Sequence, residues 1–160
     1  MAKPIKRSEH IIKLSREHHF SLLFGWKIRT GLKKGIDLER IEAYIRYFWK
    51  EHQIPHFAQE DVLYEKVNDE LVQRAFREHR EMEEIMAKIN ETPEKEKADL
   101  FQTIADKVTD HVRFEERILF PHLEEQIADS ELAEIARKHH EMQPEPLEDN
   151  WEDEFWAREK

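Results

Sequence analysis

Two stretches of the sequence place a histidine four residues before a glutamate. His56 and Glu60 lie in HFAQEDVLY, and His111 and Glu115 lie in HVRFEERIL. On an α-helix, positions four residues apart lie on one face, one turn from each other. An imidazole and a carboxylate at this spacing can therefore coordinate the same metal ion.

The same tripeptide, Arg-Glu-His, comes before each of these motifs. It ends at His18 upstream of the first motif and at His79 upstream of the second. Each interval between a tripeptide and the following motif has room for a helix, a turn and most of a second helix. The repeat therefore predicts two helical hairpins, each of which contributes two histidines and one glutamate to a shared centre.

Such a centre has the composition of a metal site. Four imidazoles and two carboxylates would be costly to bury together without a cation, whereas metal ions bind neutral imidazoles and ionised carboxylates. Six ligands are too many for one tetrahedral zinc ion and suit two ions bridged by carboxylates. Nitrogen and oxygen donors without sulfur favour iron or manganese. The candidate metal ligands are His18, His56, Glu60, His79, His111 and Glu115.

The composition of the chain favours a helical protein and argues against nucleic-acid binding. Of the 160 residues, 39% are charged and only three are glycine, a balance that suits long, surface-exposed helices. The net charge of −10 argues against nucleic acid as a partner, because nucleic acid requires a basic face. The length suits a single domain over residues 1–160, with a bundle over about 8–127 and an extension over about 128–160.

The chain contains no cysteine. This excludes disulfide bonds and thiolate metal sites, and it suits a reducing compartment, so we expect a cytoplasmic location. No apolar run approaches the roughly 20 residues of a membrane span, and no apolar segment of a signal peptide follows the basic residues at the start. We therefore expect no membrane partner.

Apolar periodicity and capping residues predict four long helices and a shorter fifth. The expected ranges are about 8–30, 37–67, 70–90 and 93–125 for the long helices and about 130–140 for the fifth. Residues 1–8 would form a polar arm. Pro55 lies within the second helix, where a proline kinks or ends a helix. Four long helices with short connections predict an all-α fold, an antiparallel up-down four-helix bundle.

Three large aromatic residues, Trp151, Phe155 and Trp156, lie close to the end of the chain. Their polar neighbours favour an appendage that docks its aromatic rings on the bundle. A contact between two copies in a homodimer is the alternative, and the sequence does not choose between them.

Other polar residues near the motifs could support the candidate ligands. His52 lies one turn before His56, as a seventh ligand or as a partner of a ligand, and the second role is favoured. Asp61 and Glu116 directly follow the two motif glutamates, either as partners of ligands or as solvent-facing acids. His122 is too far along its helix to share the ions. Surface or flank positions are expected for His10, His19, His139 and His140.

Taken together, these motifs resemble the hemerythrin-like, or HHE cation-binding, family over about residues 8–127. The resemblance is carried by the histidine of the first helix, HFxxE[DE] from His56, Glu-His on the third helix, and HxxxEE from His111 followed by Leu-Phe-Pro. It implies a four-helix bundle around two non-haem iron ions, with oxo or hydroxo and carboxylate bridges. The six candidate ligands match the family's ligand positions.

The sequence also departs from the oxygen-carrying hemerythrins. Those proteins have a second histidine one turn from the third-helix ligand, where this chain has Ala75 and Glu83. They use HxxxxD on the fourth helix, where this chain has HxxxE, as in iron–sulfur repair di-iron proteins and the iron-sensing domain of a ubiquitin-ligase subunit. The missing histidine could leave an open coordination position, unless Glu83 fills it.

We therefore expect a non-haem di-iron protein that binds O₂ or a related diatomic such as nitric oxide, for sensing, storage or iron handling. The alternative is a di-iron oxidoreductase that reduces nitric oxide or peroxide, or repairs iron–sulfur centres; its chemistry would belong to the metals. A metal-free scaffold that interacts through its aromatic tail is a third possibility, and the buried polar cluster argues against it.

Overall fold

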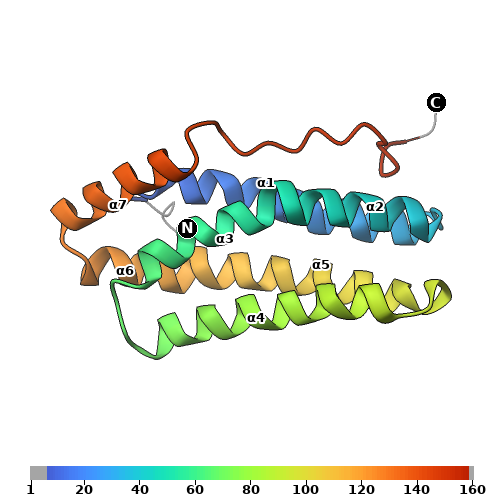
Figure 1. The fold of residues 1–160 in the computed structure, drawn as a ribbon, viewed down its shortest axis with the longest axis horizontal. Helices are drawn as coiled ribbons and strands as arrows, with labels where there is room; N and C mark the ends of the chain where they lie inside the picture. Colours follow the sequence, from blue (N-terminus) through green and yellow to red (C-terminus); the bar gives the residue numbers. More distant parts are fainter. Residues whose placement is uncertain (1–6, 159–160) are drawn as a thin grey trace, which may run out of the picture.

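The computed structural model describes residues 7–158, which form a helical bundle with an extended C-terminal segment (Figure 1). Most of the expected polar arm, residues 1–6, lies outside the described residues. The helices are α1 (Ile12–Lys33), α2 (Leu38–Phe48), α3 (Ile54–Tyr64), α4 (Glu70–Glu91), α5 (Lys97–Phe114), α6 (Phe120–Gln126) and α7 (Asp129–Met142). The prediction of an all-α four-helix bundle with a short fifth helix is confirmed.

The bundle consists of four long helical rods, namely α1, α2–α3, α4 and α5–α6. Two of these rods contain a π-helical turn. Trp49–Gln53 joins α2 to α3, and Glu115–Leu119 joins α5 to α6. In each rod a proline, Pro55 or Pro121, follows in the first turn of the next α-helix. A proline has no N–H and clashes with the preceding turn, and the wider π turn accommodates it. The second predicted helix therefore continues through Pro55 instead of ending there.

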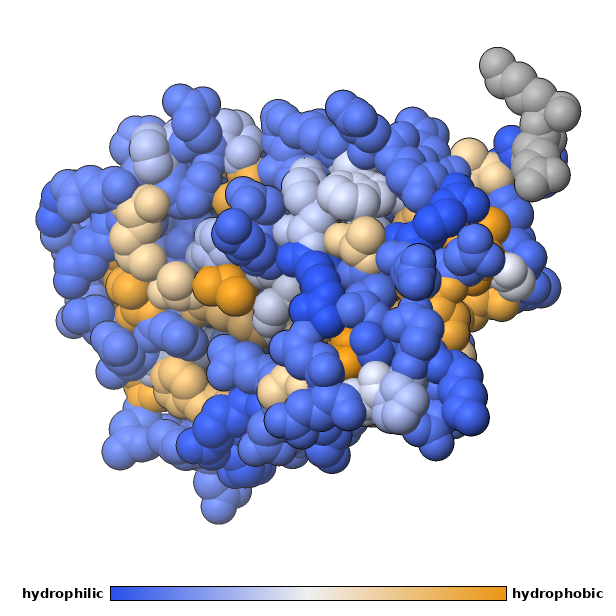
Figure 2. Space-filling model, turned by 45° about the vertical axis from the view of Figure 1, so that its right-hand side comes forward, coloured by the Kyte–Doolittle hydropathy of each residue, from blue (hydrophilic) through white to orange (hydrophobic). Residues whose placement is uncertain are grey.

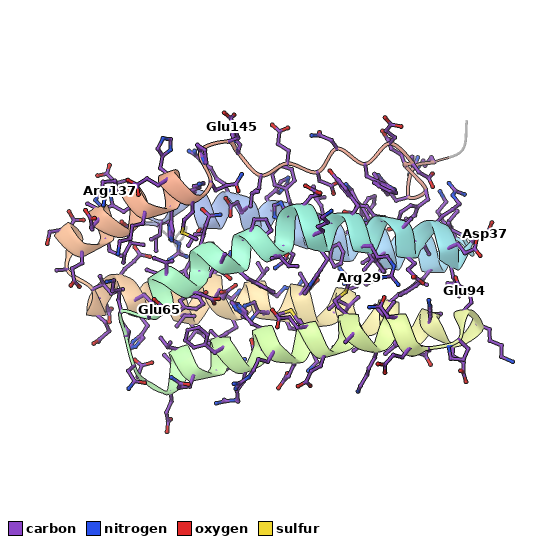
Figure 3. The ribbon with its side chains drawn as sticks, viewed as in Figure 1. Arg29, Asp37, Glu65, Glu94, Arg137 and Glu145 are labelled. Atoms are coloured by element: carbon purple, nitrogen blue, oxygen red, sulfur yellow. The ribbon has the colours of Figure 1, made fainter. Side chains whose placement is uncertain are left out.

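The rods alternate in direction, so that α1 and α4 run one way and α2–α3 and α5–α6 run back (Figure 1). Gly35, with a φ of 69°, ends α1, because this left-handed conformation favours glycine. The Asp69 side chain accepts a hydrogen bond from the Val72 amide and caps α4. Asp37 and Glu94 lie at one end of the bundle and Glu65 lies towards the other (Figure 3).

The core divides into two apolar clusters along the bundle axis. One gathers around Phe24, Phe48 and Ile104, and the other around Leu14, Tyr64 and Phe120. On α1 the clusters are separated by a buried polar stretch that includes His18, and the other long rods also carry buried polar residues at this level. The apolar clusters thus position a polar layer in the middle of the bundle.

The C-terminal segment runs along α1 and α2 (Figure 1). Phe155 is 2% exposed and fits over Gly31, where an added Cβ would come within 2.7 Å of the ring. The buried Asp149 carboxylate accepts hydrogen bonds from Lys27 Nζ at 2.9 Å and from the Tyr44 hydroxyl at 2.6 Å. The aromatic tail therefore docks on its own bundle, as the first of the two interpretations expected, and a homodimer contact stays a prediction.

The visible surface agrees with the charged composition. Figure 2 shows a mainly hydrophilic face in which hydrophobic residues form separate patches. Among the residues that the structure describes, the helices lack the combination of length and apolar character that a membrane span requires.

Candidate metal centre

The structure brings all six candidate ligands together in the polar layer. α1, α3, α4 and α5 each contribute one histidine, α3 also contributes Glu60, and Glu115 begins the π turn after α5. Each of the six is at most 5% exposed. Since a buried charge requires a partner, these side chains must satisfy one another or a cation.

The ligand atoms form two adjacent groups that share both glutamates. One group comprises His18, His56, Glu60 and Glu115, and the other comprises Glu60, His79, His111 and Glu115. Within each group one ligand atom per residue lies within 4.8 Å of all the others. Each group could therefore hold a metal ion, and the two groups have both carboxylates in common.

The Nε2 atom of every candidate histidine faces this centre. His18 Nε2 lies 3.1 Å from Glu60 Oε2 and 3.1 Å from Glu115 Oε1. His56 Nε2 lies 3.1 Å from Glu60 Oε2, and His111 Nε2 lies 3.1 Å from Glu115 Oε1. The imidazoles thus point at both shared carboxylates from different sides.

The Nδ1 atom of every candidate histidine faces an acid outside the two groups. The distances are 2.9 Å from His18 to Glu116, 2.8 Å from His56 to Glu17, 2.7 Å from His111 to Glu78 and 3.4 Å from His79 to Asp61. An ionised carboxylate only accepts hydrogen bonds, so in the three shorter contacts Nδ1–H donates and the Nε2 lone pair of a neutral imidazole is directed inward. Histidines that bind metals are oriented in this way.

Two of these acids, Glu17 and Glu78, had no role in the sequence interpretation. Each is the middle residue of an Arg-Glu-His tripeptide, and the repeat of that tripeptide was the signal that could have found them. On a helix, the residue next to an inward-facing ligand is rotated by about 100° around the helix axis, so its side chain reaches a neighbouring helix. Asp61 and Glu116, left open between two roles, are partners of His79 and His18.

Protons on histidine balance part of the charge in the second group. Burial lowers the pKa of His79, but the neighbouring Asp61 and Glu60 carboxylates outweigh burial and raise the pKa to about 9. Burial lowers the pKa of His111 to about 4 despite its bond to Glu78. At neutral pH the protonated His79 therefore donates from Nε2 to the neutral His111 Nε2, 3.0 Å away.

The donor set leaves inward-facing atoms that a metal ion would satisfy. His56 Nε2, Glu60 Oε1 and Glu115 Oε1 are buried atoms that lack a hydrogen-bond partner among the described residues. Burial and the neighbouring Glu60 also raise the pKa of Glu115 well above its usual value. Inward atoms without partners and two carboxylates in contact are what a cation would satisfy, so the residues present fit a metal.

Glu83 and Ala75 do not complete the centre. Glu83 is exposed and belongs to neither ligand group, and Ala75 is buried but offers no donor atom. Glu83 instead lines a groove of about 420 Å³ together with Phe57, Phe76 and His79. His79, at 5% exposed, is the least buried of the six candidate ligands, so this groove approaches the centre from outside.

The remaining histidines follow the predictions with one exception. His52 lies outside both groups, and its Nε2 lies 3.2 Å from the carbonyl oxygen of Glu17, so its hydrogen bond reaches the ligand set only through Glu17, whose carboxylate contacts His56. His122 contacts Asp69 at the start of α4. The expectation that His139 lies on the surface or flank is wrong: it is 1% exposed and its Nε2 lies 2.7 Å from the Gln59 carbonyl oxygen, because α7 packs against α3.

Tyr64 makes a further polar contact with the centre, and it had no role in the sequence analysis. Its hydroxyl donates a hydrogen bond to Glu115 Oε2, although the two residues lie on different rods. Tyr64 is fully buried and lies four residues after Glu60. That helical spacing, which continues the HxxxE stripe, was the available signal.

The comparison with protein families identifies the chain. The model of the Hemerythrin HHE cation binding domain matches residues 10–123 and, in a second match, residues 72–145. The comparisons with curated proteins and with solved structures gave no match. The first range includes all six candidate ligands, and the second begins in α4. The chain therefore belongs to the hemerythrin HHE cation-binding family.

Proposed function

We propose that this protein is a non-haem di-iron protein that binds O₂ or a related diatomic such as nitric oxide, for sensing, storage or iron handling. The observation that carries the proposal is the pair of four-ligand groups that share Glu60 and Glu115. Shared carboxylates suit two ions with oxo or hydroxo bridges, and imidazole with carboxylate favours iron or manganese. The six ligands proposed are His18, His56, Glu60, His79, His111 and Glu115.

The protein's own residues would hold and isolate the ions. The four histidines are oriented by acids at Nδ1, which strengthens an imidazole as a ligand. The two apolar clusters above and below the polar layer exclude bulk water. Bound iron would supply redox chemistry and, at an open coordination position, a site for a diatomic ligand.

Two features support access by a small molecule. The groove beside His79 approaches the centre from the surface. Ala75 lies one turn from His79 on α4 and contributes no ligand atom. A small, uncharged diatomic suits this route better than a large substrate, because the six ligands themselves are almost completely buried.

The test is anaerobic loading with Fe²⁺, elemental analysis, and optical spectra recorded with O₂, nitric oxide and azide. We expect about two irons per chain and a spectrum that changes with at least one of the three molecules. A chain that binds two irons but responds to none of them would have a closed site, and an iron-holding role would replace diatomic binding. A single zinc and no iron would contradict the di-iron proposal itself.

The alternative function is a di-iron oxidoreductase that reduces nitric oxide or peroxide, or repairs iron–sulfur centres. The same absence of a ligand at Ala75 favours it, since an open position can bind a substrate as well as a carried ligand. Steady turnover of nitric oxide or peroxide by the iron-loaded protein would favour the enzyme. Reversible binding without turnover would favour the first proposal.

A further inference from the structure

The two shared glutamates use their oxygen atoms differently. Glu60 Oε2 lies 3.1 Å from Nε2 of both His18 and His56, and Glu60 Oε1 lies 3.3 Å from Nε2 of His79. One oxygen of Glu60 therefore faces each ligand group. Glu60 can bridge the groups through both of its oxygens.

Glu115 faces both groups with a single oxygen. Its Oε1 lies 3.1 Å from Nε2 of His18 in one group and 3.1 Å from Nε2 of His111 in the other. The second oxygen, Oε2, accepts the hydrogen bond from the Tyr64 hydroxyl. The carboxylate thus has one oxygen directed at histidines of both ligand groups and one oxygen hydrogen-bonded to a phenol.

The difference follows from one position of the internal repeat. Tyr64 comes four residues after Glu60, and Leu119 comes four residues after Glu115. Both side chains are fully buried in the same apolar cluster. Leucine has no donor, so the second half of the chain offers no counterpart of the Tyr64 hydroxyl.

We propose that Tyr64 is a positioning residue that confines Glu115 to one metal-facing oxygen and thereby keeps a coordination position open for a small molecule. This inference rests on the proposed di-iron function. A carboxylate that binds a metal ion through one oxygen occupies fewer coordination positions than a carboxylate that binds through both oxygens. Without the phenol, Glu115 Oε2 turns towards one ion and occupies the position that an exogenous ligand would use.

The direct test compares Tyr64→Phe with Tyr44→Phe. Tyr44 is also fully buried and its hydroxyl lies 2.6 Å from a carboxylate oxygen, but that carboxylate, Asp149, belongs to the C-terminal segment. Both variants keep the ring and lose one buried hydroxyl. We expect both to bind about two irons, and only Tyr64→Phe to lose azide affinity, by about 10- to 100-fold, as for other residues that orient ligands.

A cobalt-loaded form separates this inference from the proposed function. The visible absorption of Co²⁺ weakens when its coordination number rises, and it needs no redox activity. Weaker absorption in Tyr64→Phe than in wild type and Tyr44→Phe supports the inference, even if iron-loaded protein reacts with neither O₂ nor nitric oxide. The proposed function would then fail while the role of Tyr64 stood.

Several results would overturn the role given to Tyr64. Equal azide affinity and equal cobalt spectra in wild type and Tyr64→Phe would do so, as would loss of both ions from a folded Tyr64→Phe protein. A phenolate-to-iron(III) absorption band in the wild type would make Tyr64 a ligand, which contradicts a positioning role. The wild type also tests the inference if the variant does not fold, because a cobalt spectrum unchanged by azide would exclude the open position.

Discussion

The two halves of the bundle, α1–α3 and α4–α6, present nearly the same chemistry to the centre. Each contributes two histidines, one shared glutamate and two acids that face Nδ1 atoms. Glu17 and Glu78 bind histidines of their own halves, whereas Asp61 and Glu116 reach across to the opposite half. Neither half is complete alone, so the centre ties the two hairpins together.

The halves differ in what surrounds this common set. Tyr64 contacts a shared glutamate, but Leu119 at the corresponding position cannot. The 3.4 Å contact of His79 with Asp61 is longer than that of His18 with Glu116 at 2.9 Å, and His79 lies beside a surface groove. The repeat therefore accounts for the two ligand groups, and its departures lie where the proposed access route reaches them.

The largest effect is expected from removal of a shared carboxylate. Glu60 belongs to both ligand groups, so Glu60→Ala should reduce the metal content from about two ions per chain to nearly none. Elemental analysis after desalting measures this directly. Retention of one tightly bound ion would show that the groups do not depend on a common glutamate.

A single histidine should affect mainly its own half. His56→Ala and His111→Ala should each weaken the ion of one group and leave the other partly occupied. His19, adjacent to His18 but exposed, provides the matched control, and His19→Ala should bind metal like the wild type. Metal titrations that cannot distinguish the three variants would remove the basis for two separate groups.

The acids at Nδ1 should have a smaller effect, and a similar one in both halves. Glu17→Gln and Glu78→Gln should each lower metal affinity by about 10- to 100-fold, because an outer partner orients the ligand and increases its basicity. Glu83→Gln changes an exposed glutamate that belongs to neither group and serves as control. Competition with a chelator measures the metal affinity of all three variants. A loss of affinity confined to Glu83→Gln would contradict the role given to Glu17 and Glu78.

Metal binding should release protons near neutral pH. His79 has a pKa of about 9 in the metal-free fold, so at pH 7 its proton must leave before an ion binds. Apparent metal affinity should therefore rise with pH up to about 9. The same raised pKa stabilises the metal-free fold below pH about 6.5, the ordinary value, and this contribution is lost as pH rises through 9.

Calorimetric metal titrations in buffers that differ in ionisation enthalpy give the number of protons released for each metal ion bound. The count at pH 7 should exceed the count above pH 9, where His79 is already neutral. Equal counts at both pH values would show that His79 is not the proton donor. Burial keeps His111 neutral at pH 7, with a pKa of about 4, so this residue should contribute no proton.

The smallest effect on the metal is expected from the C-terminal segment. Asp149→Asn weakens the buried contacts with Lys27 and Tyr44, and it should lower the free energy of unfolding by about 1–3 kcal/mol. Metal content should not change, because Asp149 belongs to neither ligand group. Urea unfolding measures the stability, and elemental analysis of the same sample measures the metal content. A loss of metal would show that the C-terminal segment affects the metal centre.

The features that the sequence predicts well are those with helical periodicity. Apolar stripes and caps give the helices to within a few residues, and the fifth runs over Asp129–Met142 where about 130–140 was expected. The six candidate ligands meet because the spacing of four within HxxxE is a local property of a helix. Their convergence from four rods follows from the repeat.

The features that the sequence left open depend on contacts between helices. The π-helical turns before Pro55 and Pro121 change which side chains of the following helix face the core. No local sequence pattern specifies these turns. His139 is buried only because α7 packs against α3. Tyr64 has the composition of a core residue, and its polar contact is visible only once two rods are placed side by side.

The most direct test of the account is an anaerobic titration of the metal-free protein with Fe²⁺, followed by elemental analysis. Two ligand groups joined by two glutamates predict saturation at about two irons per chain. They also predict that the Glu60→Ala protein binds nearly none. Saturation at one iron, with Glu60→Ala equal to the wild type, would contradict the shared-carboxylate centre.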